Sequence, residues 1–178
     1  MKKFLTAFFI CTFTLSLLCG CKSYKLQSKS TAVSSIKTSI NKSSVIYTNT
    51  KYGFTFSLPE SWKGYTIINS TWEGRSLDSQ GHGTITEKGP IISIRHPKWT
   101  AQVPRQDIPI MIFTINQWKD LQQDKFHIGA APINPSELGR NNNYVFALPA
   151  RYNFAFPEGY EEVENILNGN PFKAELNK

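Results

Sequence analysis

The three cysteines of the chain, Cys11, Cys19 and Cys21, all lie within its first 21 residues. The remaining sequence can therefore form no disulfide and no thiolate metal site. A domain folded from it must be stabilised by an apolar core instead of by covalent cross-links. Its length is sufficient, because a domain of about 130 residues buries roughly two thirds of the surface of its unfolded chain.

The chain begins with the pattern of a secretory signal. Lys2 and Lys3 precede an apolar segment, residues 4–18. This segment is shorter than the roughly 20 apolar residues that cross a bilayer as a helix. We therefore expect residues 1–20 to be a signal peptide and not a membrane-spanning helix.

A cysteine follows this apolar segment closely. The sequence Leu18-Cys19-Gly20-Cys21 resembles the lipobox of bacterial lipoproteins, although such signals usually carry a small or aliphatic residue at the position of Cys19. The resemblance implies signal cleavage between Gly20 and Cys21, lipid attachment at Cys21, and a location on the extracytoplasmic face of the cell membrane. Two or three acyl chains, at about 0.8 kcal/mol per buried CH₂ group, would make this anchor durable.

Positive charge is concentrated near the start of the chain. The net charge is +7, yet all thirteen acidic residues lie at Glu60 or later, and residues 22–51 contain lysines and no acid. Residues 21–44 are rich in Ser, Thr and Lys, which predicts a disordered tether with a span of roughly 25 to 30 Å. An attraction of its lysines to an anionic membrane surface is the alternative. Because the domain itself is nearly neutral, we expect no nucleic-acid partner.

Hydrophobic patterns predict that residues 45–178 form one α+β domain. Apolar and small polar residues alternate over residues 52–58, which predicts a strand with one buried face. Residues 91–96 and 108–115 are continuous apolar runs, typical of central strands that are covered on both faces. A further strand is expected over residues 144–148, after three consecutive asparagines that favour a tight turn.

Two helices and two less regular segments are also expected. Thr114 and Gln117 offer a capping box for a short helix that ends near Asp124. Pro157 and the glutamates that follow it predict the start of a second helix, which ends before Gly169. The glycine-rich residues 74–89 indicate a mobile hairpin or a long loop. Residues 152–156 are expected to be extended.

One stretch resembles a known family. Residues 52–62, YGFTFSLPESW, resemble the opening strand and Pro-x-x-Trp turn of PsbP-like domains. The resemblance implies an antiparallel sheet covered by helices, and residues 45–170 are similar to bacterial lipoproteins with such a domain. It also implies an accessory role, since the photosynthetic members are accessory subunits, and it transfers no functional residue to this chain.

His82 is the strongest single candidate for chemistry. It lies between Gly81 and Gly83, where the backbone can approach a ligand and the imidazole is expected to be exposed. The alternative is a flexible surface turn. His127 and His96 are too far from it in sequence to form a short-spaced metal motif, so we expect no metal site and no cofactor.

Three other residues are candidates for ligand binding. His96 follows a predicted buried strand, where it would line a pocket or accept a backbone hydrogen bond as a structural histidine. Trp99 lies in a proline-flanked loop and is either an interface anchor or a packing residue. Arg151 precedes Tyr152 and offers a ligand platform, although pairing with a surface carboxylate is the simpler alternative.

Taken together, these features favour a membrane-anchored extracytoplasmic binding or accessory module. Its partner would be an envelope protein or a cell-wall component. A small hydrolase or ligand-processing enzyme that uses His82 is the alternative. The solute receptor of a transporter is disfavoured, because such receptors usually have two lobes and the sequence predicts a single domain.

Overall fold

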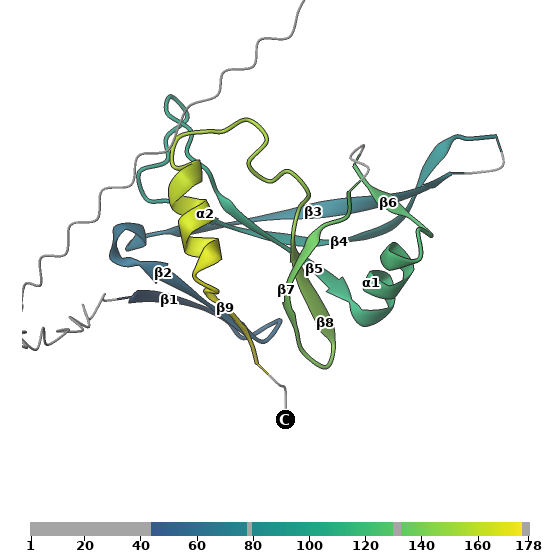
Figure 1. Ribbon diagram of the computed structural model, residues 1–178, viewed down its shortest axis with the longest axis horizontal. Helices are drawn as coiled ribbons and strands as arrows, with labels where there is room; N and C mark the ends of the chain where they lie inside the picture. Colours follow the sequence, from purple (N-terminus) through teal and green to yellow (C-terminus); the bar gives the residue numbers. More distant parts are fainter. Residues whose placement is uncertain (1–43, 78–79, 130–132, 176–178) are drawn as a thin grey trace, which may run out of the picture. The chain divides into compact units, whose positions relative to one another are not determined.

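The computed structural model describes residues 44–77, 80–129 and 133–175, which form two antiparallel sheets and two short helices (Figure 1). The expected signal and tether, with Gly20 and Cys21, lie outside the described residues. Within the described residues, no helix is both long enough and apolar enough to cross a membrane. The α+β class with an antiparallel sheet is confirmed.

The larger sheet has six strands in the order β6-β3-β4-β5-β8-β7. Its strands are β3 (Thr66–Leu77), β4 (Gly83–Arg95), β5 (Ile108–Thr114), β6 (His127–Ile128), β7 (Ser136–Arg140) and β8 (Tyr144–Leu148). The predicted central strands are thus confirmed, because β4 and β5 pair with each other in the middle of this sheet.

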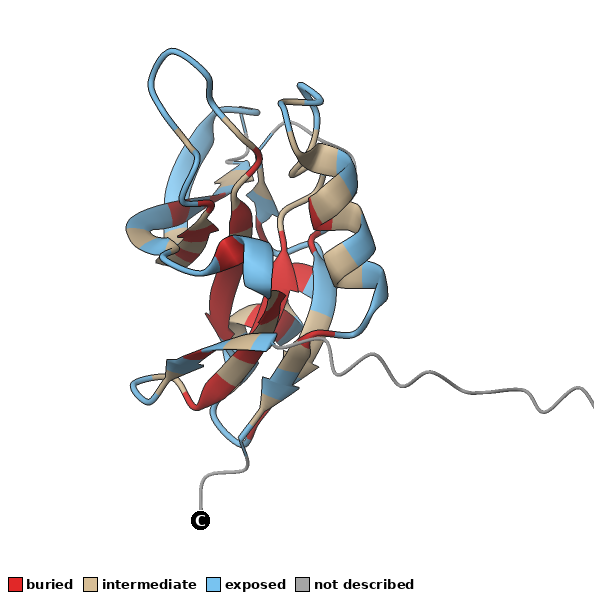
Figure 2. Cartoon of the chain, turned by 90° about the vertical axis from the view of Figure 1, so that its left-hand side faces the viewer, coloured by how far each residue is buried: buried red, intermediate tan, exposed pale blue. Residues whose placement is uncertain are grey.

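Strand β5 separates two hydrophobic clusters. Ile108, Ile110 and Ile112 lie in the first cluster, whereas Met111 and Phe113 lie in the second. All five are at most 1% exposed, as expected of a strand covered on both faces. In Figure 2 the buried residues gather on the central strands, and exposed residues lie on the loops and also on parts of the strands and helices.

The smaller sheet covers the first cluster. It contains β1 (Ser44–Asn49), β2 (Phe54–Pro59) and β9 (Phe172–Ala174), with β2 in the centre. Phe54, Phe56 and Leu58 are buried and the residues between them are partly exposed. The predicted alternation is confirmed, although the strand begins at Phe54 because the residues before it form the β1–β2 turn.

Each helix adds to a different cluster. Helix α1 (Ile115–Gln122) has the predicted capping box of Thr114 and Gln117, and it buries Trp118 and Leu121 in the second cluster. Helix α2 (Tyr160–Asn168) buries Val163 in the first cluster. It begins after Gly159, whose positive φ of 82° ends the preceding loop, and not directly at Pro157.

The loop alternative for residues 74–89 is wrong. Strands β3 and β4 pair through most of this region and form a long hairpin that extends from the sheet (Figure 1). Two of its glycines lie beneath aromatic rings: Gly89 faces Trp72, and Gly74 faces Phe126. The glycines therefore make room for side chains of the second cluster and do not mark a loop.

The expected extended segment at residues 152–156 is also wrong, since this region forms consecutive turns. The amide of Phe154 donates to the Arg151 carbonyl, and that of Phe156 to the Asn153 carbonyl. Phe154 and Phe156 are 72% and 65% exposed. Alternating apolar residues resemble a strand in sequence, but here neither phenylalanine packs in either hydrophobic cluster.

Candidate functional site

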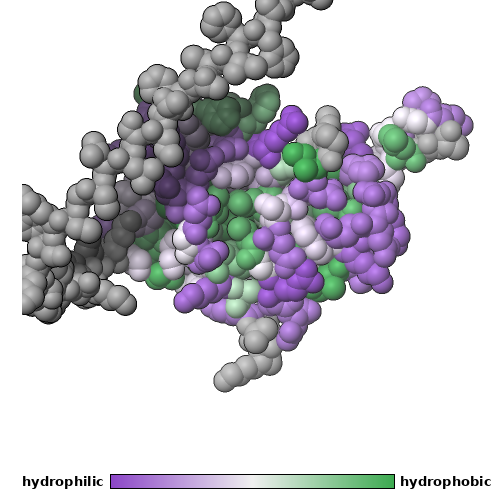
Figure 3. Space-filling model, in the orientation of Figure 1, coloured by the Kyte–Doolittle hydropathy of each residue, from purple (hydrophilic) through white to green (hydrophobic). Residues whose placement is uncertain are grey.

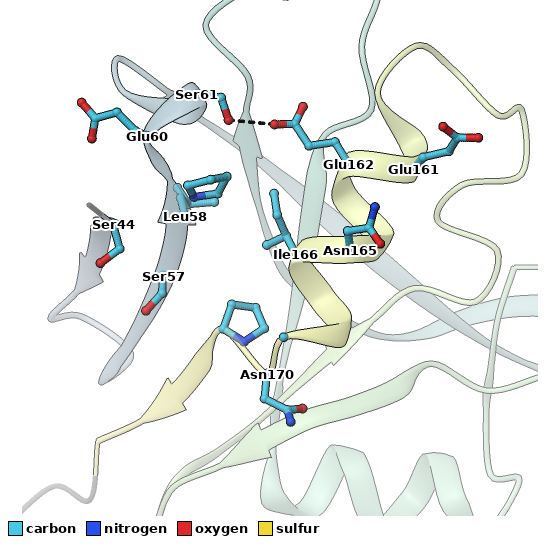
Figure 4. A pocket seen from close by; sticks show the side chains of 13 residues that line it. Ser44, Ser57, Leu58, Glu60, Ser61, Glu161, Glu162, Asn165, Ile166 and Asn170 are labelled. Atoms are coloured by element: carbon cyan, nitrogen blue, oxygen red, sulfur yellow. Dashed lines mark hydrogen bonds between the residues drawn. The ribbon is translucent and has the colours of Figure 1, made fainter. Parts of the chain in front are cut away.

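An open groove of about 980 Å³ lies between the small sheet and helix α2. One wall comes from the end of β2 and the 3₁₀ helix η1 (Glu60–Trp62), and the other from α2 (Figure 4). Leu58, Ile166 and Pro171 are apolar lining residues, of which Ile166 is partly exposed whereas Leu58 and Pro171 are buried. Ser44, the first described residue, also lines it, so the chain enters the fold beside the groove.

The polar side chains of the groove are mainly acids and amides. Glu60, Glu161 and Glu162 line it together with Asn165 and Asn170, and none of the described lining residues is basic. Glu60 pairs with Lys63 at 3.5 Å and Glu162 with Arg105 at 3.6 Å, so part of this negative charge is neutralised, and the remainder favours a positively charged ligand.

One hydrogen bond joins the two walls. The hydroxyl of Ser61 donates to Oε1 of Glu162 over 2.8 Å, and Figure 4 shows this contact across the groove. The two residues are 101 positions apart in sequence. This exposed contact links η1 to the first turn of α2.

Arg105 also contacts Glu162 through an ion pair. Its guanidinium pairs with Glu158, and its Nη2 lies 3.6 Å from Oε2 of Glu162. The Arg105 side chain is only 15% exposed, so screening by water weakens these pairs less than at an open surface. A Cβ at Gly159 would lie 2.9 Å from Nη2 of Arg105, which adds a steric reason for glycine before α2. The start of α2 is thus fixed by charge and by packing.

His96 is a structural residue beside this network. It is 4% exposed, its Nδ1 accepts a hydrogen bond from the Lys98 amide at 3.0 Å, and its ring meets Trp62 edge-on at 5.0 Å. Burial, with the nearby positive charge of Arg105 as a smaller cause, lowers the pKa of His96 below its usual value. The neutral imidazole is therefore favoured, in keeping with the backbone-bonded alternative.

Trp99 packs against a fixed ion pair. The Arg95 guanidinium lies 3.9 Å from the centre of the Trp99 ring and donates to both carboxylate oxygens of Asp107. These hydrogen bonds raise the pKa of Arg95 above its usual value. The arrangement combines a cation–π contact with a bidentate salt bridge, which supports the packing alternative for Trp99.

The four sequence candidates do not form one site. His96 and Trp99 are neighbours at one end of β4, whereas His82 lies just before its other end, about 40 Å away along an extended strand. Arg151 is exposed in the turns before α2. None of the four lines the groove or a second, smaller cavity of about 470 Å³ between β7 and α2.

The groove itself was not predicted from sequence. Its residues come from segments about one hundred positions apart, and only the Pro-x-x-Trp turn gave a local signal. The described residues contain no group of three or more side chains suited to hold a metal ion. No family model, curated protein or solved structure matches the chain.

Proposed function

We propose that the protein is a membrane-anchored extracytoplasmic lipoprotein whose domain is a binding or accessory module. The pattern that ends at Cys21 supports the anchor. The open acidic groove between β2 and α2 is the observation that carries the binding role. The resemblance of residues 52–62 to PsbP-like domains is consistent with an accessory role.

The groove favours a peptide segment that carries positive charge. Three carboxylates line it, and the partly exposed Ile166 offers an apolar contact to the rest of such a ligand. Basic segments of envelope proteins and amine-bearing cell-wall peptides share this chemistry. The hydrolase alternative has less support, because His82 lies in the hairpin and lines neither cavity.

The lipid anchor is tested by expressing the full chain in a bacterium that processes lipoproteins. The cells are supplied with a fatty acid that carries an alkyne label. We expect the wild-type protein to carry the label on its amino-terminal peptide and to sediment with membranes. Cys21→Ser should abolish the label, because the acylated sulfur is lost, whereas Cys19→Ser should keep it. An unlabelled amino-terminal peptide in the wild-type protein would contradict the anchor.

The groove is tested with a chain of residues 44–178, which retains every described strand, both helices and both hydrophobic clusters. A fluorescent peptide of alternating lysine and valine should bind it, and a matched glutamate–valine peptide should not. The double change Glu60→Gln and Glu161→Gln should weaken binding about fivefold in fluorescence anisotropy, because two partly exposed charges are lost.

The matched control neutralises Glu73 and Glu175, neither of which lines the groove. Glu73→Gln with Glu175→Gln changes the net charge by the same amount and should leave the affinity unchanged. Equal losses in the two double variants would show attraction by overall charge, and the groove proposal would then fail.

A further inference from the structure

His96 fixes the turn that follows β4. Its Nδ1 accepts a hydrogen bond from the Lys98 amide at 3.0 Å, and its carbonyl accepts one from the Trp99 amide at 3.0 Å. Nδ1 can accept a hydrogen bond only while it carries no proton, because a protonated imidazole is a donor at both nitrogens. Protonation of His96 therefore breaks the bond from Lys98 and places two N–H groups against each other.

The same imidazole packs against η1. Trp62 is the last residue of η1, is 1% exposed, and meets the His96 ring edge-on at 5.0 Å between ring centres. Within the described residues its indole N–H donates no hydrogen bond, so packing in the first cluster and against His96 holds the ring. Glu60 and Ser61, which precede Trp62 in η1, line the groove. A displacement of His96 would thus reach one wall of the groove.

The charges around His96 come from several elements. Arg105 of the β4–β5 loop and Lys98 of the turn oppose protonation, whereas Glu162 of α2 and Glu158 of the preceding loop favour it. Both carboxylates are already ion-paired with Arg105, and η1 meets the imidazole with an uncharged ring. Burial is the largest effect and Arg105 the second, and together they lower the pKa of His96 from its usual 6.5.

Acid therefore acts against the buried position of His96. An imidazole in water takes up a proton near pH 6.5, whereas the folded arrangement keeps His96 neutral to lower pH because its pKa is lowered. The stability that this residue contributes is complete above the pKa of the unfolded chain, and it is lost as the pH falls toward the pKa of the folded chain. A state in which the imidazole has left its site becomes favoured over the same range.

We propose that protonation of His96 opens the turn of residues 96–99, displaces η1 and thereby weakens ligand binding in the groove between η1 and α2. The inference rests on the proposed function, because the groove that it regulates is the proposed binding site. It predicts a domain that holds a lysine-bearing ligand at neutral pH and releases it in acid, although the charge of the lysine is unchanged over this range.

Peptide affinity as a function of pH tests this coupling. The chain of residues 44–178 and the lysine–valine peptide are compared between about pH 7.5 and about pH 5 by fluorescence anisotropy. The parent should lose about fivefold or more in affinity. His96→Asn should lose less than about twofold, because the asparagine oxygen can accept from the Lys98 amide and does not titrate. The carboxylates of the groove are the same in both chains, so the difference between them reports His96.

His127→Asn is the matched control. His127 is exposed in β6 and pairs with Arg75, whereas His96 follows Arg95, which pairs with Thr66. The two sites are thus separated by about 30 Å along β3. Helix α1, beside β6, lies away from α2 on a side where Figure 3 shows mainly hydrophilic side chains. This variant should keep the pH dependence of the parent.

Magnetic resonance of the parent chain without ligand requires no substitution. The His96 ring should titrate with a midpoint below pH 6.5. The Lys63 and Tyr65 amides, which donate to carbonyls of η1, should lose protection from hydrogen exchange with the same midpoint, relative to amides of α1.

The two kinds of measurement separate this inference from the groove proposal. The inference is overturned if His96 stays neutral down to about pH 5, or if it titrates while Lys63 and Tyr65 stay protected. It is also overturned if His96→Asn loses as much affinity in acid as the parent, or if His127→Asn removes the pH dependence. A peptide that does not bind at neutral pH would refute the groove proposal instead, and the exchange of the η1 amides would still decide whether His96 releases η1.

Discussion

Phe54→Ala is expected to lower the free energy of unfolding by about 3–5 kcal/mol. The Phe54 ring is fully buried and lies 5.7 Å from Tyr47, 5.0 Å from Phe146 and 5.2 Å from Phe172, measured between ring centres. These partners belong to β1, β8 and β9, so one side chain joins both sheets. Its removal leaves a cavity that three strands would have to move to fill.

Urea unfolding of residues 44–178 measures this loss. Since a domain of this size is stable by only about 5–15 kcal/mol, the loss in Phe54→Ala should lower the urea concentration at the unfolding midpoint clearly. Phe154→Ala is the matched control, because the same residue type is removed from a site that is 72% exposed. A change below about 0.5 kcal/mol is expected there. Similar losses in both variants would contradict the assignment of the core.

The elements that the sequence predicted well are those with a local physical cause. Alternation places Phe54, Phe56 and Leu58 on one face of β2, and the apolar run of β5 is buried on both faces. The capping box of Thr114 is also a local pattern, since its two partners are three residues apart. In each case the sequence pattern that predicts the element lies within a few neighbouring residues.

Two expectations were wrong, namely the loop alternative for residues 74–89 and the extended segment at residues 152–156. Glycine usually marks turns, but Gly74 and Gly89 lie in strands because Phe126 and Trp72 occupy the space of their missing side chains. Residues 152–156 alternate like a strand, yet the hydrogen bonds that a strand would need are replaced by turns between neighbouring residues. The first outcome depends on which segments become neighbours, whereas the second depends on local turns that alternation alone does not reveal.

The groove could not be predicted for the same reason. Ser61 and Glu162 meet across it only after β2 and α2 have packed on the first hydrophobic cluster. His82 was conspicuous because of its glycine neighbours, but the fold places it in the hairpin. Sequence motifs identify reactive residue types, whereas a binding surface requires the arrangement of distant segments.

The groove also lies close to the loop that precedes α2. Glu162 lines the groove and contacts Arg105, while Arg105 pairs with Glu158 of the loop that carries Phe154 and Phe156.

Gly89→Ala is expected to lower the free energy of unfolding by about 2–3 kcal/mol. A Cβ at this position would lie 2.6 Å from the Trp72 ring, which stacks on Phe113 and donates its Nε1 hydrogen to the Ile112 carbonyl at 2.9 Å. Displacing the ring overpacks the second cluster and weakens that buried hydrogen bond. Alanine restricts the unfolded chain, which offsets about 0.4–1 kcal/mol of this cost.

Gly83→Ala provides the control within the same strand. The nearest heavy atoms to a Cβ at Gly83 are 4.0 Å away, which is ordinary van der Waals contact, so only the effect on the unfolded chain remains. Urea unfolding should show this variant to be as stable as the parent or more stable by up to about 1 kcal/mol. The opposite signs of the two changes separate steric exclusion at Gly89 from a general intolerance of alanine in β4. If Gly89→Ala were as stable as Gly83→Ala, Trp72 would not be held against the backbone, and the second cluster would be packed differently from the arrangement described above.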